Sequence, residues 1–197
     1  IGSHMVRMLV SKGIDVTGLD SMALGHKGAL PQAVSLIVGN VGEKRSYGHV
    51  FSSKKIDAVI HFAGYISVEE SNRDPRKYFM NNLIAPVALL DVMQENGVKN
   101  IIFSSTAAVY GNPSVIPIPE DHRKEPTSVY GMTKWCFEQL LSMYDQKKSF
   151  RSICLRYFNA SGASLDGVFG EAHIPETHII PLALSTLTGK REKFNLY

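Results

Sequence analysis

Tyr130 and Lys134 are the residues whose types and spacing are best suited to chemistry in this sequence. They stand four residues apart in the string YGMTK, so on a helix both side chains lie on one face. A phenol with a pKa of about 10 is a poor base at neutral pH, but a neighbouring ammonium favours the phenolate and lowers that pKa. The pair predicts a general acid/base, although such pairs on a helix are more often a packed phenol beside a solvated cation.

Hydroxyl side chains follow a strand-like segment upstream of that pair. Ser104, Ser105 and Thr106 come directly after the apolar run that ends at Phe103. In open α/β sheets, ligands bind beyond the carboxyl ends of the strands, where a hydroxyl can hydrogen-bond a substrate oxygen. Such residues can also simply satisfy the backbone of a turn. The tyrosine and lysine downstream favour a site over a turn.

The elements that must position these side chains alternate between helix length and strand length. The predicted strands span residues 14–19, 34–38, 58–63, 99–104 and 151–157. The predicted helices span residues 3–12, 44–53, 75–93, 128–144 and 179–188. Pro86 should bend the third of these helices. Apolar strands separated by helices indicate a parallel sheet covered on both faces. The predicted fold class is therefore α/β, with a doubly wound, Rossmann-like sheet.

The first residues resemble the second half of a dinucleotide-binding pattern. Gly2 precedes a helix, and the next strand leads to Asp20, 18 positions on, a spacing typical of a ribose-binding carboxylate. In such folds the first strand lies mid-sheet and its turn carries the phosphate-binding glycines. We therefore expect an internal fragment of a longer protein. Residues 1–163 would form an NAD-binding domain lacking its first strand in this chain, and 164–197 would begin a substrate-binding region, with a new strand starting at 194–197.

The composition is that of an ordinary globular protein. Of 197 residues, 44% are hydrophobic and 20% are charged, and the net charge is +3. Without long Lys/Arg runs, neither a nucleic acid nor a membrane is expected as a partner. The apolar runs are too short for a transmembrane helix, and no secretory signal is visible. Cys136 and Cys154 lack metal-ligand spacing, so we expect free thiols, no metal site and a cytoplasmic protein.

Several strings together resemble the UDP-glucose (UDP-galactose) 4-epimerases of the extended short-chain dehydrogenase/reductase superfamily. They are HFAG at 61–64, FSSTAAVYG at 103–111, YGMTK at 130–134, LRYFNASGA at 155–163 and PETHIIP at 175–181. The similarity runs over essentially the whole chain. The tyrosine–lysine pair alone specifies only the superfamily, whereas the complete set narrows the resemblance to the 4-epimerases.

The resemblance implies a role for each matching residue. Tyr130 would be the catalytic acid/base, Lys134 its partner and Thr106 the hydroxyl that assists at the sugar O4. The implied NAD contacts are Gly2, Asp20, Asn40, Phe62, Ala63, Gly64, Asn81, Ser104, Tyr130, Lys134 and Tyr157. The implied UDP-sugar contacts are Thr106, Tyr130, Phe158, Asn159, His178 and Ile179. The resemblance implies no metal ligand, and the carboxylate of Asp20 favours NAD over NADP.

Two positions depart from the family pattern. Ile66 stands where many members have a lysine within reach of the cofactor, so one anchoring cation is absent. Asn40 replaces a usual aspartate, and its carbonyl can still accept a hydrogen bond from the adenine amine. The related 4,6-dehydratases carry Asp-Glu after the threonine, whereas this chain has Ala107-Ala108. The implied chemistry therefore stops at reversible oxidation of C4.

The implied reaction is NAD-dependent 4-epimerisation of a UDP-hexose through a 4-keto intermediate. Tyr130 would take the proton of the 4-hydroxyl while C4 gives hydride to NAD⁺, and the keto sugar would accept hydride on its other face. Three alternatives remain open: 4-epimerisation of another UDP-sugar, reduction of a nucleotide-linked ketosugar, and non-catalytic nucleotide binding.

The expected assembly is a homodimer. The helices over about 75–96 and 128–147 resemble those that pair as a four-helix interface in this family, although their apolar faces could instead pack on the sheet. Because the central strand and its glycine turn are expected to be missing, we expect the fragment alone to bind NAD weakly or not at all and to be inactive.

Overall fold

The strands form two parallel sheets in the computed structural model, which describes residues 1–147, 149–173 and 176–193. The first sheet pairs β1 (Thr17–Asp20) with β2 (Ser35–Val38). The second has the order β3 (Ala58–His61), β4 (Asn100–Ser104), β5 (Arg151–Leu155). Parallel strands with helical connections are the predicted α/β arrangement. The strand start predicted at 194–197 lies outside the described residues.

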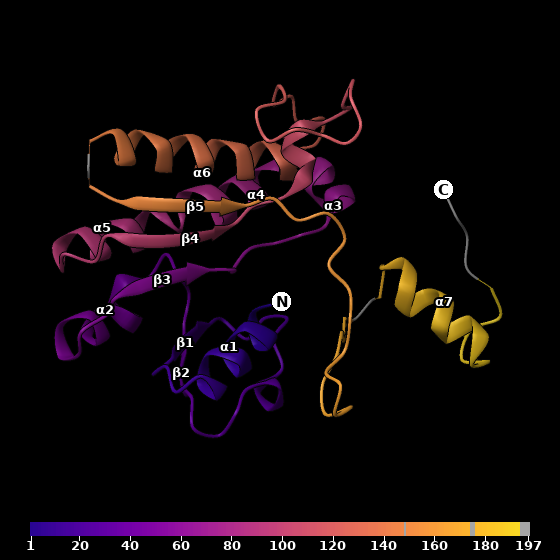
Figure 1. Ribbon diagram of the computed structural model, residues 1–197, viewed down its shortest axis with the longest axis horizontal. Helices are drawn as coiled ribbons and strands as arrows, with labels where there is room; N and C mark the ends of the chain where they lie inside the picture. Colours follow the sequence, from indigo (N-terminus) through magenta and orange to yellow (C-terminus); the bar gives the residue numbers. More distant parts are fainter. Residues whose placement is uncertain (148, 174–175, 194–197) are drawn as a thin grey trace.

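Helices connect the strands and cover the second sheet (Figure 1). The longer helices are α1 (Gly2–Ser11), α2 (Lys44–Ser53), α5 (Val87–Glu95), α6 (Val129–Gln146) and α7 (Ile179–Leu187). The shorter ones are α3 (Val68–Arg73), α4 (Pro75–Phe79), the 3₁₀ turns η1 (Lys27–Ala29) and η3 (Ala107–Tyr110), and the π turn η2 (Met80–Ile84). α6 packs against β5, whereas α7 stands apart from both sheets. Among the described residues, no helix is long and apolar enough to cross a membrane.

Pro86 interrupts the helix predicted over 75–93. Proline lacks an N–H, and in a regular helix its ring would clash with the carbonyl four residues earlier, that of Asn82. The chain instead widens into the π turn η2, where the N–H of Ala85 donates to the carbonyl of Met80 at 2.8 Å. The helix therefore divides into α4, η2 and α5, and the division falls where the sequence predicts a bend. The wider turn carries Asn81 and Asn82, which reappear at the candidate site.

The hydrophobic core lies between the second sheet and the helices α5 and α6. On β4, Ile101 and Phe103 are 1% and 0% exposed and alternate with less buried neighbours, as the pleat requires. On α6, Phe137 and Leu141 are fully buried and are spaced by one helical turn. Burying one such side chain stabilises the fold by about 1.5–3 kcal/mol. This packing fixes the end of β4 relative to α6, the two elements that carry the predicted catalytic side chains.

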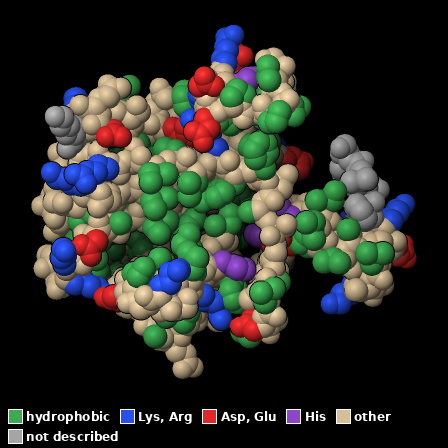
Figure 2. Space-filling model, in the orientation of Figure 1, with side chains coloured by type: hydrophobic (Ala, Val, Ile, Leu, Met, Phe, Trp, Pro, Cys, Tyr) green, Lys and Arg blue, Asp and Glu red, His purple; other side chains and the backbone are tan. Residues whose placement is uncertain are grey.

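The two sheets are not joined by strand hydrogen bonds among the described residues. Figure 2 shows hydrophobic side chains gathered in the space between them.

The start of α1 differs from the prediction. The helix was predicted from residue 3, but α1 already begins at Gly2 and Ile1 occupies the cap position. Ile1 offers no side-chain acceptor, so no side chain satisfies the first N–H groups of α1.

Candidate active site

The amino end of α6 is fixed by three capping side chains, two of them from α3. They accept hydrogen bonds from the first three N–H groups of α6: Asn72 from Val129 at 3.1 Å, Ser71 from Tyr130 at 3.0 Å and Ser128 from Gly131 at 3.1 Å. Because these donors have no partner within the helix itself, each cap stabilises the terminus by about 1 kcal/mol. The backbone of Tyr130 is thereby fixed by two different elements.

Gly131 lets α6 approach the turn that carries Thr106. A Cβ at Gly131 would lie 2.8 Å from the carbonyl oxygen of Ala108, closer than real side chains come. Thr106 begins that turn, η3, as its N-cap, with Oγ1 accepting from the N–H of Ala108 at 3.1 Å. The close contact places Thr106 near enough to the phenol of Tyr130 for its hydroxyl to lower the pKa of that phenol in part.

Lys134 lies one turn further along α6 and is only 3% exposed. Its Nζ donates to the carbonyl of Ser104 at 2.9 Å and lies 5.9 Å from the ring centre of Tyr130. Among the described residues no carboxylate pairs with this ammonium. Burial therefore lowers the pKa of Lys134 to about 8. The predicted geometry of the pair is present, and two of the three ammonium donors remain available to a ligand.

The pKa of Tyr130 differs in direction from the prediction. The sequence predicts a phenol whose pKa is lowered by the lysine. In the structure, burial raises the pKa of Tyr130, and the hydrogen bond with Thr106 opposes that rise only in part. The prediction was wrong for the chain as described, because desolvation of the phenolate outweighs the other influences. A bound group that adds positive charge would act in the opposite direction.

The loop after β3 comes close to Lys134. A Cβ at Gly64 would lie 3.4 Å from Nζ of Lys134 and 3.1 Å from Oδ1 of Asn82. Asn82 is 2% exposed and holds this loop through both backbone groups of Tyr65, accepting from N at 2.8 Å and donating to O at 2.9 Å. The neighbouring Asn81 donates to Asn82 Oδ1 at 2.9 Å. The π turn thus places Asn82 against the backbone of the loop after β3, and Asn81 against the side chain of Asn82.

The predicted cofactor residues on the first sheet lie at the carboxyl ends of β1 and β2. Asp20 is exposed, and its Oδ1 accepts from the N–H of Met22 at 2.7 Å. The Oδ1 of Asn40 accepts from the N–H of Gly42 at 2.8 Å. This oxygen was expected to accept from an adenine amine, and here it closes the local turn instead.

The remaining predicted residues are cofactor contacts, which are described first, and substrate contacts. Gly2 lies against Phe62, since a Cβ at Gly2 would be 3.6 Å from that ring, and Ala63 follows at the surface. The backbone of Tyr157 accepts from Ala107 N at 2.6 Å, which joins the end of β5 to η3. The predicted substrate residues are not gathered at the phenol. Phe158 and Asn159 are exposed beyond β5, and His178 and Ile179 begin the separate helix α7.

A buried ion pair that the sequence reasoning missed supports the site. Glu138 has a 4% exposed side chain and accepts from Arg156 Nη2 at 2.6 Å and Nε at 3.1 Å. It also accepts from the hydroxyl of Ser105, while Arg156 donates to the phenol of Tyr110 at 2.8 Å. The pair therefore connects α6, the end of β5 and both ends of the segment that contains Thr106. A signal was present, because Glu138 continues the four-residue spacing of Tyr130 and Lys134 on one helix face.

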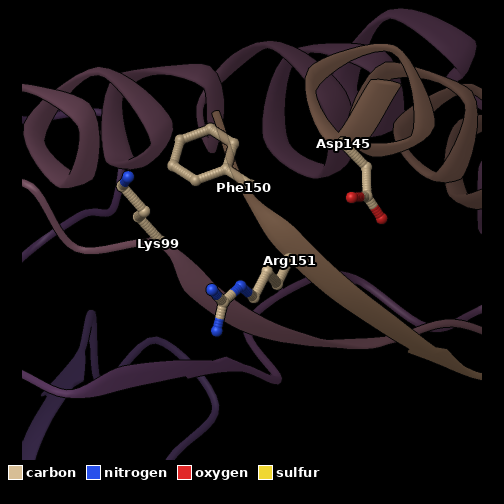
Figure 3. A pocket seen from close by; sticks show the side chains of 4 residues that line it. All are labelled: Lys99, Asp145, Phe150 and Arg151. Carbon is tan, nitrogen blue, oxygen red and sulfur yellow. The ribbon is translucent and has the colours of Figure 1, made fainter. Parts of the chain in front are cut away.

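A surface hollow at the opposite end of the second sheet is a weaker candidate. Lys99, Asp145, Phe150 and Arg151 line a cavity of about 340 Å³ there (Figure 3). Arg151 begins β5, so the hollow lies at the amino ends of the strands. Ligands in open α/β sheets bind at the carboxyl ends, and this is where Thr106, Tyr130 and Lys134 meet.

Known proteins with similar sequences match this chain over its whole length. The UDP-glucose 4-epimerase of Lacticaseibacillus casei is 41% identical over 197 residues, and that of Streptococcus mutans is 43% identical over 199 residues. Each match covers 100% of this chain and 60% of the relative. The chain thus spans about 60% of the length of the curated relatives it matches.

Solved structures agree with this result. One UDP-glucose 4-epimerase crystal structure has a TM-score of 0.95 at 41% identity and covers 98% of this chain and 59% of its own. The Brucella ovis UDP-glucose 4-epimerase in complex with NAD also has a TM-score of 0.95, at 37% identity, covering 100% of this chain and 60% of its own. Residues 1–195 match the NAD dependent epimerase/dehydratase family. The chain belongs to this family.

Proposed function

We propose that the protein carrying this chain interconverts UDP-glucose and UDP-galactose by NAD-dependent 4-epimerisation through a 4-keto intermediate. The observation that carries the proposal is the meeting of Thr106, Tyr130 and Lys134 at the carboxyl end of the second sheet. The relatives support it, because they are named UDP-glucose 4-epimerases and some are described in complex with NAD, UDP or UDP-glucose.

The residues of the site fit NAD. The first N–H groups of α1 lack a side-chain cap and are available to an anion such as a pyrophosphate. Asp20 is exposed at the end of β1, where a carboxylate binds ribose hydroxyls. Gly64 leaves room beside Lys134, whose two remaining donors suit a second ribose. Bound NAD⁺ would supply a hydride acceptor and a positive charge near the phenol.

The chemistry assigned to the side chains is a reversible proton transfer. Tyr130 as phenolate would accept the proton of the sugar 4-hydroxyl, and bound NAD⁺ would supply the acceptor for the C4 hydride, so that the O–H and C–H bonds break and a C4 ketone forms. Thr106 holds the sugar oxygen by its hydroxyl. Return of the hydride to the opposite face of C4, and of the proton to its oxygen, would give the epimer with no net oxidation. Ala107 and Ala108 offer no carboxylate for elimination of water.

We also propose the division of the chain and its assembly. Residues 1–163 would belong to an NAD-binding domain and 164–197 to the start of a substrate-binding region, in a cytoplasmic protein. The apolar side chains between the two sheets support a further strand between these sheets (Figure 2).

Pairing of two copies through η2 and α6 is supported by Ile84 and Met143, which are 52% and 60% exposed. A single monomeric mass for the full-length protein in light scattering would refute the dimer.

Substrate turnover tests the proposed function. The full-length protein is incubated with NAD⁺ and UDP-galactose, and UDP-glucose formation is followed by chromatography. UDP-N-acetylgalactosamine, UDP-glucuronate and UDP-xylose are tested in parallel. We expect UDP-galactose to be converted. Conversion of another sugar alone would move the assignment to a different 4-epimerase. Net consumption of NADH with a ketosugar would indicate a reductase, and binding without any turnover would indicate a nucleotide-binding protein.

A further inference from the structure

Helix α3 joins the loop after β3 to the first turn of α6. The loop carries Gly64, which leaves room beside Lys134, and it leads directly into α3. α3 lies against α6 at the end where α6 begins (Figure 1). The sequence analysis singled out no residue of α3. This helix nevertheless stands between the loop assigned to the cofactor and the helix turn that carries Tyr130.

The end of the loop is fastened to α3 and α4 by a closed set of hydrogen bonds. Ser67 is the N-cap of α3, and its Oγ accepts from the N–H of Glu70 at 3.1 Å. The N–H of Ser67 itself donates to the phenol oxygen of Tyr78 at 3.0 Å. Tyr78 is fully buried and in turn donates to the carboxylate of Glu70 at 2.9 Å. Because the three residues come from the loop, α3 and α4, the end of the loop cannot shift without moving α3.

At its other end, α3 holds the backbone of Tyr130. Ser71 is fully buried, and its hydroxyl donates to the carbonyl of Val68 at 2.6 Å and accepts from the N–H of Tyr130 at 3.0 Å. Asn72 accepts from the N–H of Val129 at 3.1 Å. These two N–H groups belong to the first turn of α6, where a helix offers them no partner of its own. The two caps therefore tie the start of α6 to the loop after β3 through a single helix of six residues.

We propose that Ser71 and Asn72 are positioning residues, which hold the phenol of Tyr130 in register with the loop assigned to the cofactor. The inference rests on the proposed function, because C4 of the sugar must then lie within reach of the phenol and of the hydride acceptor at the same time. When reacting groups must be aligned, a misplacement of about 1 Å can cost roughly 100-fold in rate. Ser128 also caps α6, but it belongs to the chain just before that helix and does not tie the helix to the loop.

Removal of one of these caps should slow the chemical step and leave binding unchanged. S71A deprives the partly buried N–H of Tyr130 of its acceptor, so the first turn of α6 loosens and the phenol leaves its aligned position. Contacts with NAD and the UDP-sugar are not altered directly, so KM should change little. N72A acts in the same way on the neighbouring Val129. N72D restores an acceptor at that position, and its negative charge is also favourable at a helix N-terminus.

The test measures kcat and KM for UDP-galactose with the full-length protein and NAD⁺, in S71A, N72A and N72D. The matched control is N96A, which removes the hydrogen bond from Asn96 to the carbonyl of Val92, 2.8 Å long, at the carboxyl end of α5. Circular dichroism and thermal melting check that each variant is folded. A second readout needs no turnover: hydrogen exchange of the peptide over residues 128–134 is followed by mass spectrometry.

We expect kcat to fall roughly 10–100-fold in S71A, to fall less in N72A and to recover in N72D, with KM little changed and N96A equal to the wild type. Exchange over residues 128–134 should be about 5-fold faster in S71A, as expected for the loss of one cap. A folded S71A with the wild-type kcat would overturn the proposal. If S71A does not fold, the wild-type kcat in N72A, or no recovery in N72D, would overturn it instead.

The two readouts separate this inference from the proposed function. Turnover by the wild type together with an unchanged kcat in S71A would refute the positioning role and leave the epimerase assignment intact. Lack of turnover with every UDP-sugar would refute the assignment. Hydrogen exchange would then decide whether the caps hold α6, since equal exchange in the wild type and in S71A would overturn that as well.

Discussion

Replacing Glu138 by glutamine tests whether the buried ion pair holds the site together. The side chain of Glu138 is 4% exposed and that of its partner Arg156 is 21% exposed. E138Q keeps the shape of the side chain and one oxygen for the hydroxyl of Ser105, but it removes the negative charge that the guanidinium faces at 2.6 Å. The substitution thus isolates the charge from the packing.

The expected cost follows from the burial of both groups. Breaking a buried pair by removing one partner costs about 3–5 kcal/mol, because the remaining charge stays desolvated. Arg156 keeps some exposure and its bond to Tyr110, so we expect the lower end, about 3 kcal/mol. For a chain of this size 1 kcal/mol shifts the melting temperature by about 2–4 °C, so E138Q should melt roughly 6–12 °C lower.

Thermal and urea unfolding of the full chain measure this cost. The matched control is D57N, which breaks the pair between Lys55 and Asp57, whose side chains are 86% and 78% exposed and 2.9 Å apart. This control should leave the melting temperature unchanged, because water replaces the exposed interaction. The double variant E138L/R156M removes the unpaired charge and should recover most of the lost stability. If E138Q melts together with D57N, the ion pair does not support the site as argued.

Two further predictions concern α6. Unfolded Lys134 keeps its proton up to the ordinary lysine pKa of 10.5, whereas folded Lys134 releases it above a pKa of about 8. The unfolded state therefore binds more protons at Lys134 between these values, and the difference in free energy of unfolding between wild type and K134M should rise with pH across this window by roughly 3 kcal/mol, because the opposing effect of the raised pKa of Cys154 is common to both proteins. Parallel pH profiles of the two proteins would contradict the assignment. G131A forces a Cβ to 2.8 Å from the carbonyl of Ala108 and should cost about 1–3 kcal/mol in urea unfolding. Its control G48A lies in α2, where a Cβ meets nothing within 4 Å, and should be neutral or stabilising; equal effects of the two changes would refute the close contact.

The spacing of apolar residues in the sequence predicted several helices and strands close to where the structure has them. The helix over 44–53 and the helix from 179 match α2 and α7 closely, and the strand over 99–104 differs from β4 by one residue. The first strand was predicted to begin at 14 but runs over Thr17–Asp20, because apolar residues before it belong to the connection from α1. α3 was missed, since its six residues VEESNR are mostly polar and its helix is set by a Ser67 cap and contacts with α6.

The candidate catalytic residues could be named from the sequence, whereas their pKa values could not. The spacing of Tyr130 and Lys134 on a helix determines that they share a face, but the pKa of each depends on burial, which involves distant segments. Glu138 lies on the same face and could have been found by extending the spacing.

The most direct test of the central claim is the rate of UDP-galactose epimerisation by Y130F in the full-length protein with NAD⁺. Phenylalanine keeps the ring of Tyr130 and removes only the hydroxyl to which we assign the proton transfer. We expect a fall in kcat of roughly 10²–10⁴-fold, the usual contribution of a general acid/base, with circular dichroism and UDP binding unchanged. Turnover of the folded Y130F variant at the wild-type rate would contradict the account, because proton transfer would then proceed without Tyr130.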